Sequence, residues 1–321
     1  MTLLLALANE RHAALVADRR VTVDGKLADD EYNKLCILFC NDAKLAVGFT
    51  GLATLQAFDT ATWLAETLSE IANVHADIAP LLAELQVRAS SRFSSLVASD
   101  SRLSILFVGF VYWSERPEPR AYVLSNFDGP ASDPPTFSLR TISVHDSVIV
   151  EPAGTISGLP ITALASLRAL MQKALPPQAL IRFAVGHLQR AARDSRSSNR
   201  IGEQLNTAVL LAQPDTAVIS TYHSAKYTHR AYGANVVVAG APISLGIEIF
   251  GTSVLAGPEI RKHDPCWCGS GSAFKHCHMK KYGSVYARHA AFKKPLPWFV
   301  RCGVESPRAT GKVFCVASSF D

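Results

Sequence analysis

Hydrophobic and polar positions along the chain predict blocks of β-strands that alternate with pairs of α-helices. Short apolar runs bounded by turn residues predict strands, and these runs lie at 2–9, 12–17, 34–40, 44–49, 102–113, 121–127, 136–144, 205–213 and 216–223. Apolar residues recur at helical spacing in four longer stretches, which are 52–74, 78–98, 160–174 and 177–194. The Asp24-Gly25 pair predicts a tight turn, and Pro176-Pro177 separates the last two helices.

This order of elements predicts an α+β fold built as a four-layer αββα sandwich, with a helix pair on each outer face of two stacked sheets. The strict strand–helix alternation that is typical of a parallel sheet is absent, and the sequence contains no internal repeat. The periodic pattern fades after the last predicted strands. We therefore expect a main domain at 2–245, a linker at 246–260, a small module at 261–283 and a basic tail of unassigned structure at 284–321.

Composition supports a globular protein with a sizeable core. Of the 321 residues, 48% are hydrophobic and 18% are charged, whereas a disordered chain would be much more charged. No stretch reaches the roughly 18 apolar residues that a membrane-spanning helix requires. The opening TLLLALA has no basic residues ahead of it and is a poor signal peptide, so we expect a cytoplasmic protein without a membrane partner.

Charge is concentrated at the C-terminal end of the sequence. Residues 1–257 carry 21 Lys and Arg against 23 Asp and Glu, whereas residues 258–321 carry 11 against 4. A basic end of this kind favours an acidic partner such as RNA, a ribosome or an acidic protein face. A simply solvated basic tail is the alternative.

Four potential metal ligands lie in two close pairs within this basic end, namely Cys266, Cys268, Cys277 and His278. Thiolate and imidazole groups at such spacing can complete a tetrahedral zinc shell, and the Gly-Ser-Gly between the pairs allows a sharp turn. Since protein ligands would fill every position, we expect one structural Zn²⁺ per chain, which would supply the folding energy of so small a unit. His276 fits the spacing less well, and Cys36 and Cys40 are expected to pack as small hydrophobic residues.

This segment resembles the SEC-C motif, found at the C-terminus of the SecA translocation ATPase and in many other bacterial proteins. The resemblance covers about 20 residues and includes the Asp264-Pro265 lead-in and the CGSG core. It implies contacts with proteins or ribosomes, which agrees with the basic surplus.

The second residue offers chemistry of its own. If Met1 is removed, Thr2 carries a hydroxyl nucleophile and an α-amine base on one residue. An α-amine has a reference pKa of roughly 7.7–8.0, so it can accept a proton near neutral pH. Such a site also requires a nearby cation, a carboxylate to hold the cation and an N–H group for the oxyanion.

Around Thr2 and in the segments that follow it, the sequence resembles the proteasome β subunits and their bacterial relatives, which are N-terminal nucleophile (Ntn) hydrolases. Asp18 lies in VADRRVT, Lys34 in YNKLCIL and Gly48 in AVGFTG, at the family's spacing from Thr2. The resemblance covers roughly 2–225. It implies that Thr2 attacks, that Lys34 lowers its proton affinity while paired with Asp18, and that the Gly48 N–H faces the oxyanion.

Three further residues complete the resemblance. Ser157 precedes a predicted helix, and Asp194 and Ser197 lie in RDSRS, where the family has R-D-x-x-S. By analogy these three residues would gather around the Thr2 amine and orient it. One departure is Ile156, which stands where the family has glycine, and the appended zinc module is another.

The resemblance implies a threonine-type Ntn hydrolase and, within that class, a peptidase acting on peptides or proteins through an acyl-enzyme on Thr2. It also implies a homo-oligomeric ring and an unfolding ATPase as a possible partner. Two alternatives remain open. One is an amidohydrolase of the same fold that acts on small amides, and the other is an inactive Ntn-fold binding protein that is tethered through its zinc module.

Overall fold

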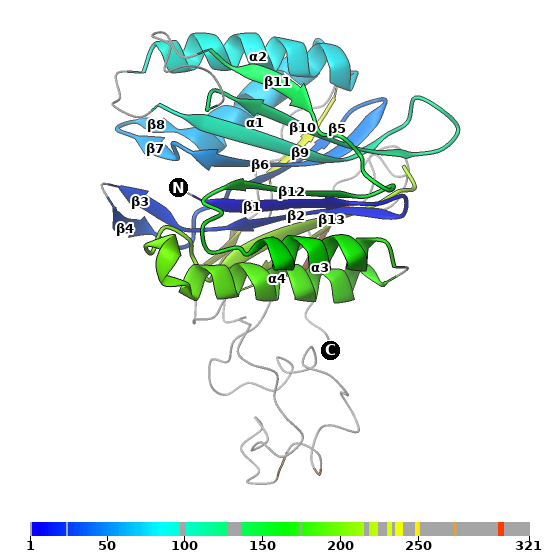
Figure 1. Cartoon of the computed structure of the whole chain (residues 1–321). Helices are drawn as coiled ribbons and strands as arrows, with labels where there is room; N and C mark the ends of the chain where they lie inside the picture. The colour runs from blue at the N-terminus through cyan, green and yellow to red at the C-terminus, as the bar shows by residue number, and fades with distance from the viewer. Residues whose placement is uncertain are drawn as a thin grey trace.

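Two six-stranded sheets lie face to face in the centre of the molecule, and a helix pair covers the outer face of each sheet (Figure 1). The computed structural model describes residues 2–23, 25–96, 101–127, 136–173, 175–214, 218–223, 230–232, 235–239, 248–250, 273, 276 and 301–304. The mixed α and β structure predicted from the sequence is confirmed, and the layers follow the order helix, sheet, sheet, helix.

The first sheet, sheet I, contains the start of the chain. Its strand order is β12-β1-β2-β13-β14-β18, and every neighbouring pair is antiparallel. The strands are β1 (Leu3–Ala8), β2 (His12–Asp18), β12 (Ile149–Gly154), β13 (Leu205–Leu211), β14 (Val218–His223) and β18 (Arg301–Val304). Helices α3 (Ile161–Met171) and α4 (Pro177–Arg193) pack on its outer face.

The second sheet, sheet II, has the order β11-β10-β9-β6-β5-β16, in which only the β16–β5 pair is parallel. The strands are β5 (Leu35–Phe39), β6 (Ala43–Gly51), β9 (Leu103–Val111), β10 (Glu118–Ser125), β11 (Ser138–Thr141) and β16 (Asn235–Val238). Helices α1 (Thr60–Ala72) and α2 (Ile78–Ser94) cover it. Short two-stranded ribbons pair β3 (Val21–Val23) with β4 (Lys26–Asp29), β7 (Thr54–Leu55) with β8 (Phe58–Asp59), and β15 (Arg230–Tyr232) with β17 (Glu248–Phe250).

Strand β1 shows why the apolar run at the start of the chain is continuous rather than alternating. Leu4 and Ala6 face the core between the two sheets, whereas Leu3, Leu5 and Leu7 face the core beneath α3 and α4. Successive strand residues point to opposite faces, so a strand buried on both sides needs apolar residues at every position. The chain therefore enters the fold in the centre of the sandwich.

The structure differs from the sequence-based boundaries in several places, and strands β15 and β16 were also not expected. The helix expected at 52–74 begins only at Thr60, because the preceding residues form the β7–β8 ribbon and the Asp59 side chain caps the helix by accepting from the Thr62 N–H. Strand β12 was not expected. In addition, β17 lies within the range expected as a linker, and β18, in the range expected as a tail, pairs with β14.

The four predicted zinc ligands fall outside the described residues. Within the described part of the chain, no helix is long and apolar enough to cross a membrane.

Candidate active site

Thr2 lies immediately before β1 and is buried, with 3% of its surface exposed. Its main chain is held on two sides. The Thr2 carbonyl accepts hydrogen bonds from the Thr155 N–H (2.9 Å) and the Thr50 Oγ1 (3.0 Å), and the Thr2 nitrogen donates to Thr50 Oγ1 (3.2 Å). Segments distant in the sequence therefore fix this residue from β6 and from the end of β12.

Asp18, the last residue of β2, is fully buried beside the start of β1. Its Oδ1 accepts from the Leu3 N–H (2.8 Å), and its Oδ2 accepts from the N–H groups of Gly202 (2.9 Å) and Arg20 (3.1 Å). The pKa of Asp18 is raised overall by burial, and the Lys34 charge and these three hydrogen bonds oppose that rise. The carboxylate thus has the partners that an ionised buried acid requires.

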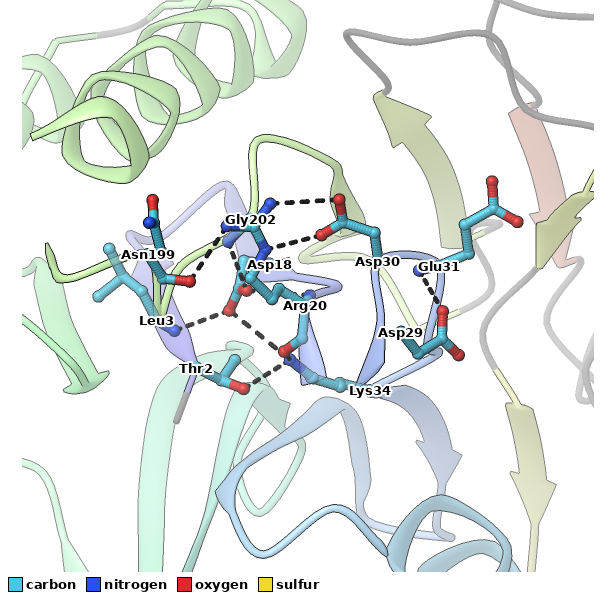
Figure 2. A network of polar contacts seen from close by, with 10 residues as sticks. All are labelled: Thr2, Leu3, Asp18, Arg20, Asp29, Asp30, Glu31, Lys34, Asn199 and Gly202. Atoms are coloured by element: carbon cyan, nitrogen blue, oxygen red, sulfur yellow. Dashed lines mark hydrogen bonds and ion pairs between the residues drawn. The ribbon is translucent and has the colours of Figure 1, made fainter. Parts of the chain in front are cut away.

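Lys34 joins the acid to the hydroxyl, as Figure 2 shows. Its Nζ lies 2.5 Å from Thr2 Oγ1, 2.5 Å from the Arg20 carbonyl oxygen and 3.7 Å from Asp18 Oδ1. The pKa of Lys34 is lowered to about 8, chiefly by burial; the Asp18 charge opposes this lowering and the Arg19 charge adds to it. The side chain is 1% exposed, so water does not screen these interactions.

Two arginines that follow Asp18 brace this corner. Arg20 binds both carboxylate oxygens of Asp30 (2.8 and 3.2 Å) and the Asn199 carbonyl (3.1 Å), so its own carbonyl is held facing Lys34 (Figure 2). Arg19 is buried and donates to the Glu31 carbonyl. Both contacts tie the loop after β4 to the end of β2.

Gly48 lies within β6, where it pairs with Leu35 on one side and Leu106 on the other. A Cβ atom there would touch the Leu15 and Leu35 side chains (3.0 and 3.2 Å) and lie 3.4 Å from the Lys34 carbonyl oxygen. Gly48 is therefore close to the backbone of the lysine. Two residues further along the same strand stands Thr50, which sequence reasoning missed, although the period of two in a strand places it on the same face as Gly48.

Ser157, Asp194 and Ser197 gather in a second cluster. Ser157 Oγ donates to the Arg196 carbonyl (2.9 Å), the Asp194 carboxylate binds the Arg196 guanidinium (2.7 and 2.9 Å), and buried Ser197 Oγ donates to the Ala191 carbonyl (2.5 Å). Arg196 lowers the pKa of Asp194 to about 2. Within the described residues, these side chains hydrogen-bond to Arg196 and to the Ala191 carbonyl, and none of them forms a hydrogen bond with Thr2.

The structure thus brings Thr2, Asp18 and Lys34 into direct contact and places Gly48 beside them. Ser157, in the loop after β12, and Asp194 and Ser197, after the end of α4, form a second cluster apart from Thr2. Among the described residues, no group of three or more His, Cys, Asp or Glu side chains could hold a metal ion. The arrangement that remains is a hydroxyl paired with a buried lysine.

Comparison with known proteins gives one local match in sequence. Residues 264–280 match the SEC-C motif, which confirms that resemblance, and this range includes all four predicted zinc ligands. The protein translocase subunit SecA of Aromatoleum aromaticum is 44% identical over 55 residues, and that of Azoarcus sp. is 37% identical over 59. These matches cover 17% and 18% of this chain but only 6% and 5% of the SecA proteins.

Among solved structures, the chain is similar to Anbu (ancestral beta-subunit) from Yersinia bercovieri, with 14% identity and a TM-score of 0.43. That comparison covers 65% of this chain and 82% of the other. An Anbu (Gly-1) mutant from Hyphomicrobium sp. strain MC1 gives 14% identity and a TM-score of 0.44, and covers 66% of this chain and 83% of the other.

Gly154 provides a test of how tightly the Thr2 backbone is packed. Its φ is +90°, and a Cβ atom would meet the Thr2 carbonyl and Thr50 Oγ1. We expect Gly154→Ala to lower the free energy of unfolding by more than about 1 kcal/mol, since strain and overlap add. Gly186→Ala is the matched control, because α4 has open space there and alanine favours a helix by up to about 1 kcal/mol. Urea denaturation compares the two, and equal stabilities would contradict the tight packing.

Proposed function

We propose that this protein is a threonine-type N-terminal nucleophile hydrolase, and specifically a peptidase, in which Thr2 becomes the reactive residue after Met1 is removed. The observation that carries the proposal is the 2.5 Å contact between Lys34 Nζ and Thr2 Oγ1, with Asp18 buried behind the lysine. A buried cation next to a hydroxyl, itself held by a carboxylate, can stabilise the negative charge that forms on the oxygen as it attacks.

The protonated form of Lys34 suits this geometry. Three acceptors surround Nζ, namely Thr2 Oγ1, the Arg20 carbonyl and the Asp18 carboxylate. The first two contacts are hydrogen bonds, and the Asp18 carboxylate lies at ion-pair distance, 3.7 Å from Nζ, where its negative charge favours the charged lysine. Its charge would stabilise the negative charge that develops on Thr2 Oγ1 during attack.

The proposed reaction balances within Thr2 and its substrate. Thr2 Oγ1 forms a bond to the amide carbonyl carbon while its proton passes to the α-amine of Thr2. The carbon–nitrogen bond then breaks, and the leaving amine takes that proton and departs. Water then attacks the resulting ester and gives a proton to the α-amine; the bond between the acyl carbon and Thr2 Oγ1 breaks, the α-amine returns the proton to Oγ1, and the acid leaves. The Gly48 N–H is the proposed donor to the oxyanion.

For the C-terminal segment we propose one structural zinc ion, held by Cys266, Cys268, Cys277 and His278. Support comes from the donor set, two pairs of thiolate or imidazole ligands within the matched SEC-C range. Bound zinc would supply folding energy to this segment and no step of the hydrolysis. Since the matched relatives are translocase subunits, we further propose a protein or ribosomal partner for this basic segment.

Assembly into a homo-oligomeric ring and an ATPase partner stay predictions. Ile161 on α3 is 83% exposed and Phe183 on α4 is 50% exposed, so a ring contact through these helices would bury both side chains.

The nucleophile can be tested by intact mass after incubation with an electrophilic peptide epoxyketone or β-lactone. We expect purified protein to begin at Thr2 and to gain one adduct on it. Thr2→Ala should lose the adduct completely, because no hydroxyl remains, whereas Thr2→Ser should keep it. Turnover of peptides rather than small amides would separate a peptidase from an amidohydrolase. Retained Met1 together with an unlabelled wild-type chain would refute the hydrolase and favour a binding protein.

The pH dependence of labelling follows from Lys34. Below a pKa of about 8 the lysine carries the charge that stabilises the attacking oxygen, and above it this charge is lost. The rate of adduct formation should therefore fall by about tenfold per pH unit above pH 8. Labelling rates measured by mass spectrometry from pH 6 to 10 test this. A rate that keeps rising through pH 9 would mean that neutral Lys34 acts as a base instead.

Metal content tests the zinc proposal. The wild-type chain should contain about one zinc per chain, and Cys266→Ser should lose most of it, because a three-ligand site binds more weakly. Cys36→Ser is the matched control, since that thiol is buried in sheet II and burial raises its pKa to about 12. Zinc is measured by inductively coupled plasma mass spectrometry after dialysis, and unchanged content in Cys266→Ser would rule out this ligand.

A further inference from the structure

Thr50 makes two contacts with the same residue. Its Oγ1 donates to the Thr2 carbonyl (3.0 Å) and accepts from the Thr2 nitrogen (3.2 Å). A hydroxyl has one hydrogen and two lone pairs. Because the hydrogen is directed at the carbonyl, the oxygen presents a lone pair to the nitrogen. Thr50 can therefore only accept from whatever N–H the Thr2 nitrogen carries.

This polarity has a consequence once Met1 is gone and the nitrogen is an amine. A neutral amine can give one N–H to Thr50, which leaves its own lone pair available for the Thr2 hydroxyl proton. After proton transfer the amine is a cation, and a hydrogen bond from a charged donor is about twice as strong as a neutral one. Thr50 thus favours the protonated amine.

The surroundings of Thr50 strengthen this contact. Thr50 is 1% exposed, and Gly154 of β12 lies against its Oγ1 with no side chain between them. The described titratable groups that face Thr2 are Lys34, from the start of β5, and Asp18, from the end of β2. Segments β6 and β12 contribute Thr50, Gly154 and Thr155 to the Thr2 contacts, none of which titrates. Lys34 opposes a charge on the amine and the Asp18 carboxylate favours it through space, whereas Thr50 is the described group whose oxygen accepts a hydrogen bond directly from the Thr2 nitrogen.

We propose that Thr50 is the positioning residue of the Thr2 amine, which it orients toward the Thr2 hydroxyl and stabilises in the protonated form. Its catalytic meaning rests on the proposed hydrolase function. The hydrogen bond itself does not, because it acts on the amine whether or not a substrate is turned over.

The test uses the full chain released from a cleavable N-terminal fusion, so that Thr2 is the first residue. The α-amine pKa is read from the pH dependence of its reaction with an acylating reagent, and only the hydroxylamine-resistant amide is counted by mass spectrometry. Thr50→Val keeps the shape but removes the acceptor, and should lower this pKa by about one unit, the loss of one charge-assisted hydrogen bond. At pH 6.5 the amine should then react about tenfold faster.

Two controls make the result specific. Thr50→Ser keeps the hydroxyl and should restore the wild-type profile. Thr60→Val removes another buried threonine hydroxyl, which donates to the Leu52 carbonyl (2.8 Å), and should leave the pKa unchanged. If Thr50→Val fails to fold by circular dichroism, Thr50→Ala provides the same comparison. An unchanged pKa without the hydroxyl, or an equal shift in Thr60→Val, would overturn the proposal.

The outcomes also separate this inference from the proposed function. A shifted amine pKa in a protein that hydrolyses nothing would support the role of Thr50 and refute the hydrolase. If both wild type and Thr50→Val hydrolyse peptides and their rates fall at the same acidic pH, the hydrolase would be supported and the role of Thr50 refuted.

Discussion

A buried ion pair between Lys34 and Asp18 determines how the start of the chain is arranged. Removing either charge from water costs several kcal/mol, so each must be fully hydrogen-bonded to be tolerated. Asp18 meets this demand with three backbone N–H groups, and Lys34 meets it with the Arg20 carbonyl and the Thr2 hydroxyl. The hydroxyl of Thr2 is therefore part of what makes the pair stable, which fixes it beside a charged lysine.

The sandwich supplies the dry environment in which this pair has a strong effect. Strand β1 is buried on both faces, because one face packs against sheet II and the other against α3 and α4. Within sheet I it lies between β2 and β12. The lysine comes from the start of β5 in the opposite sheet. Because the two sheets pack face to face, Thr2 and Lys34, each at the start of an interior strand, meet between the sheets without crossing solvent. Low exposure then keeps the local dielectric low and the electrostatic effect of Lys34 on Thr2 large.

Sequence patterns located most strands because buried strands leave continuous or alternating apolar runs. These patterns gave the wrong element, or missed one, where the backbone conformation of single residues determined the local structure. Residues 52–58 have helical apolar spacing, but Gly51 and Gln56 adopt positive φ and the chain forms a ribbon before Asp59 caps α1. Strand β12 was missed because Pro152 and Gly154 are poor strand residues, although it occupies an edge of sheet I where they are accommodated.

The spacing of Thr2, Asp18 and Lys34 along the sequence was sufficient to group these three residues, and the fold places their side chains in contact. Thr50 was not found, because a threonine within a strand carries no distinctive signal and its role depends on which strand end it faces. Asp194 matched a motif by position, yet it pairs with neighbouring Arg196 at the surface, a local competition that spacing alone does not reveal.

The partners of the first residues are encoded late in the chain. Thr155 and Gly202 supply N–H groups to Thr2 and Asp18, and the Gly202 contact spans 184 positions. During synthesis the leading segment leaves the ribosome first and must wait for most of the polypeptide before its threonine and lysine can be locked in place. A nascent or truncated product that lacks Gly202 would thus lack part of the hydrogen bonding around Asp18, which ties assembly of the Thr2 surroundings to completion of sheet I.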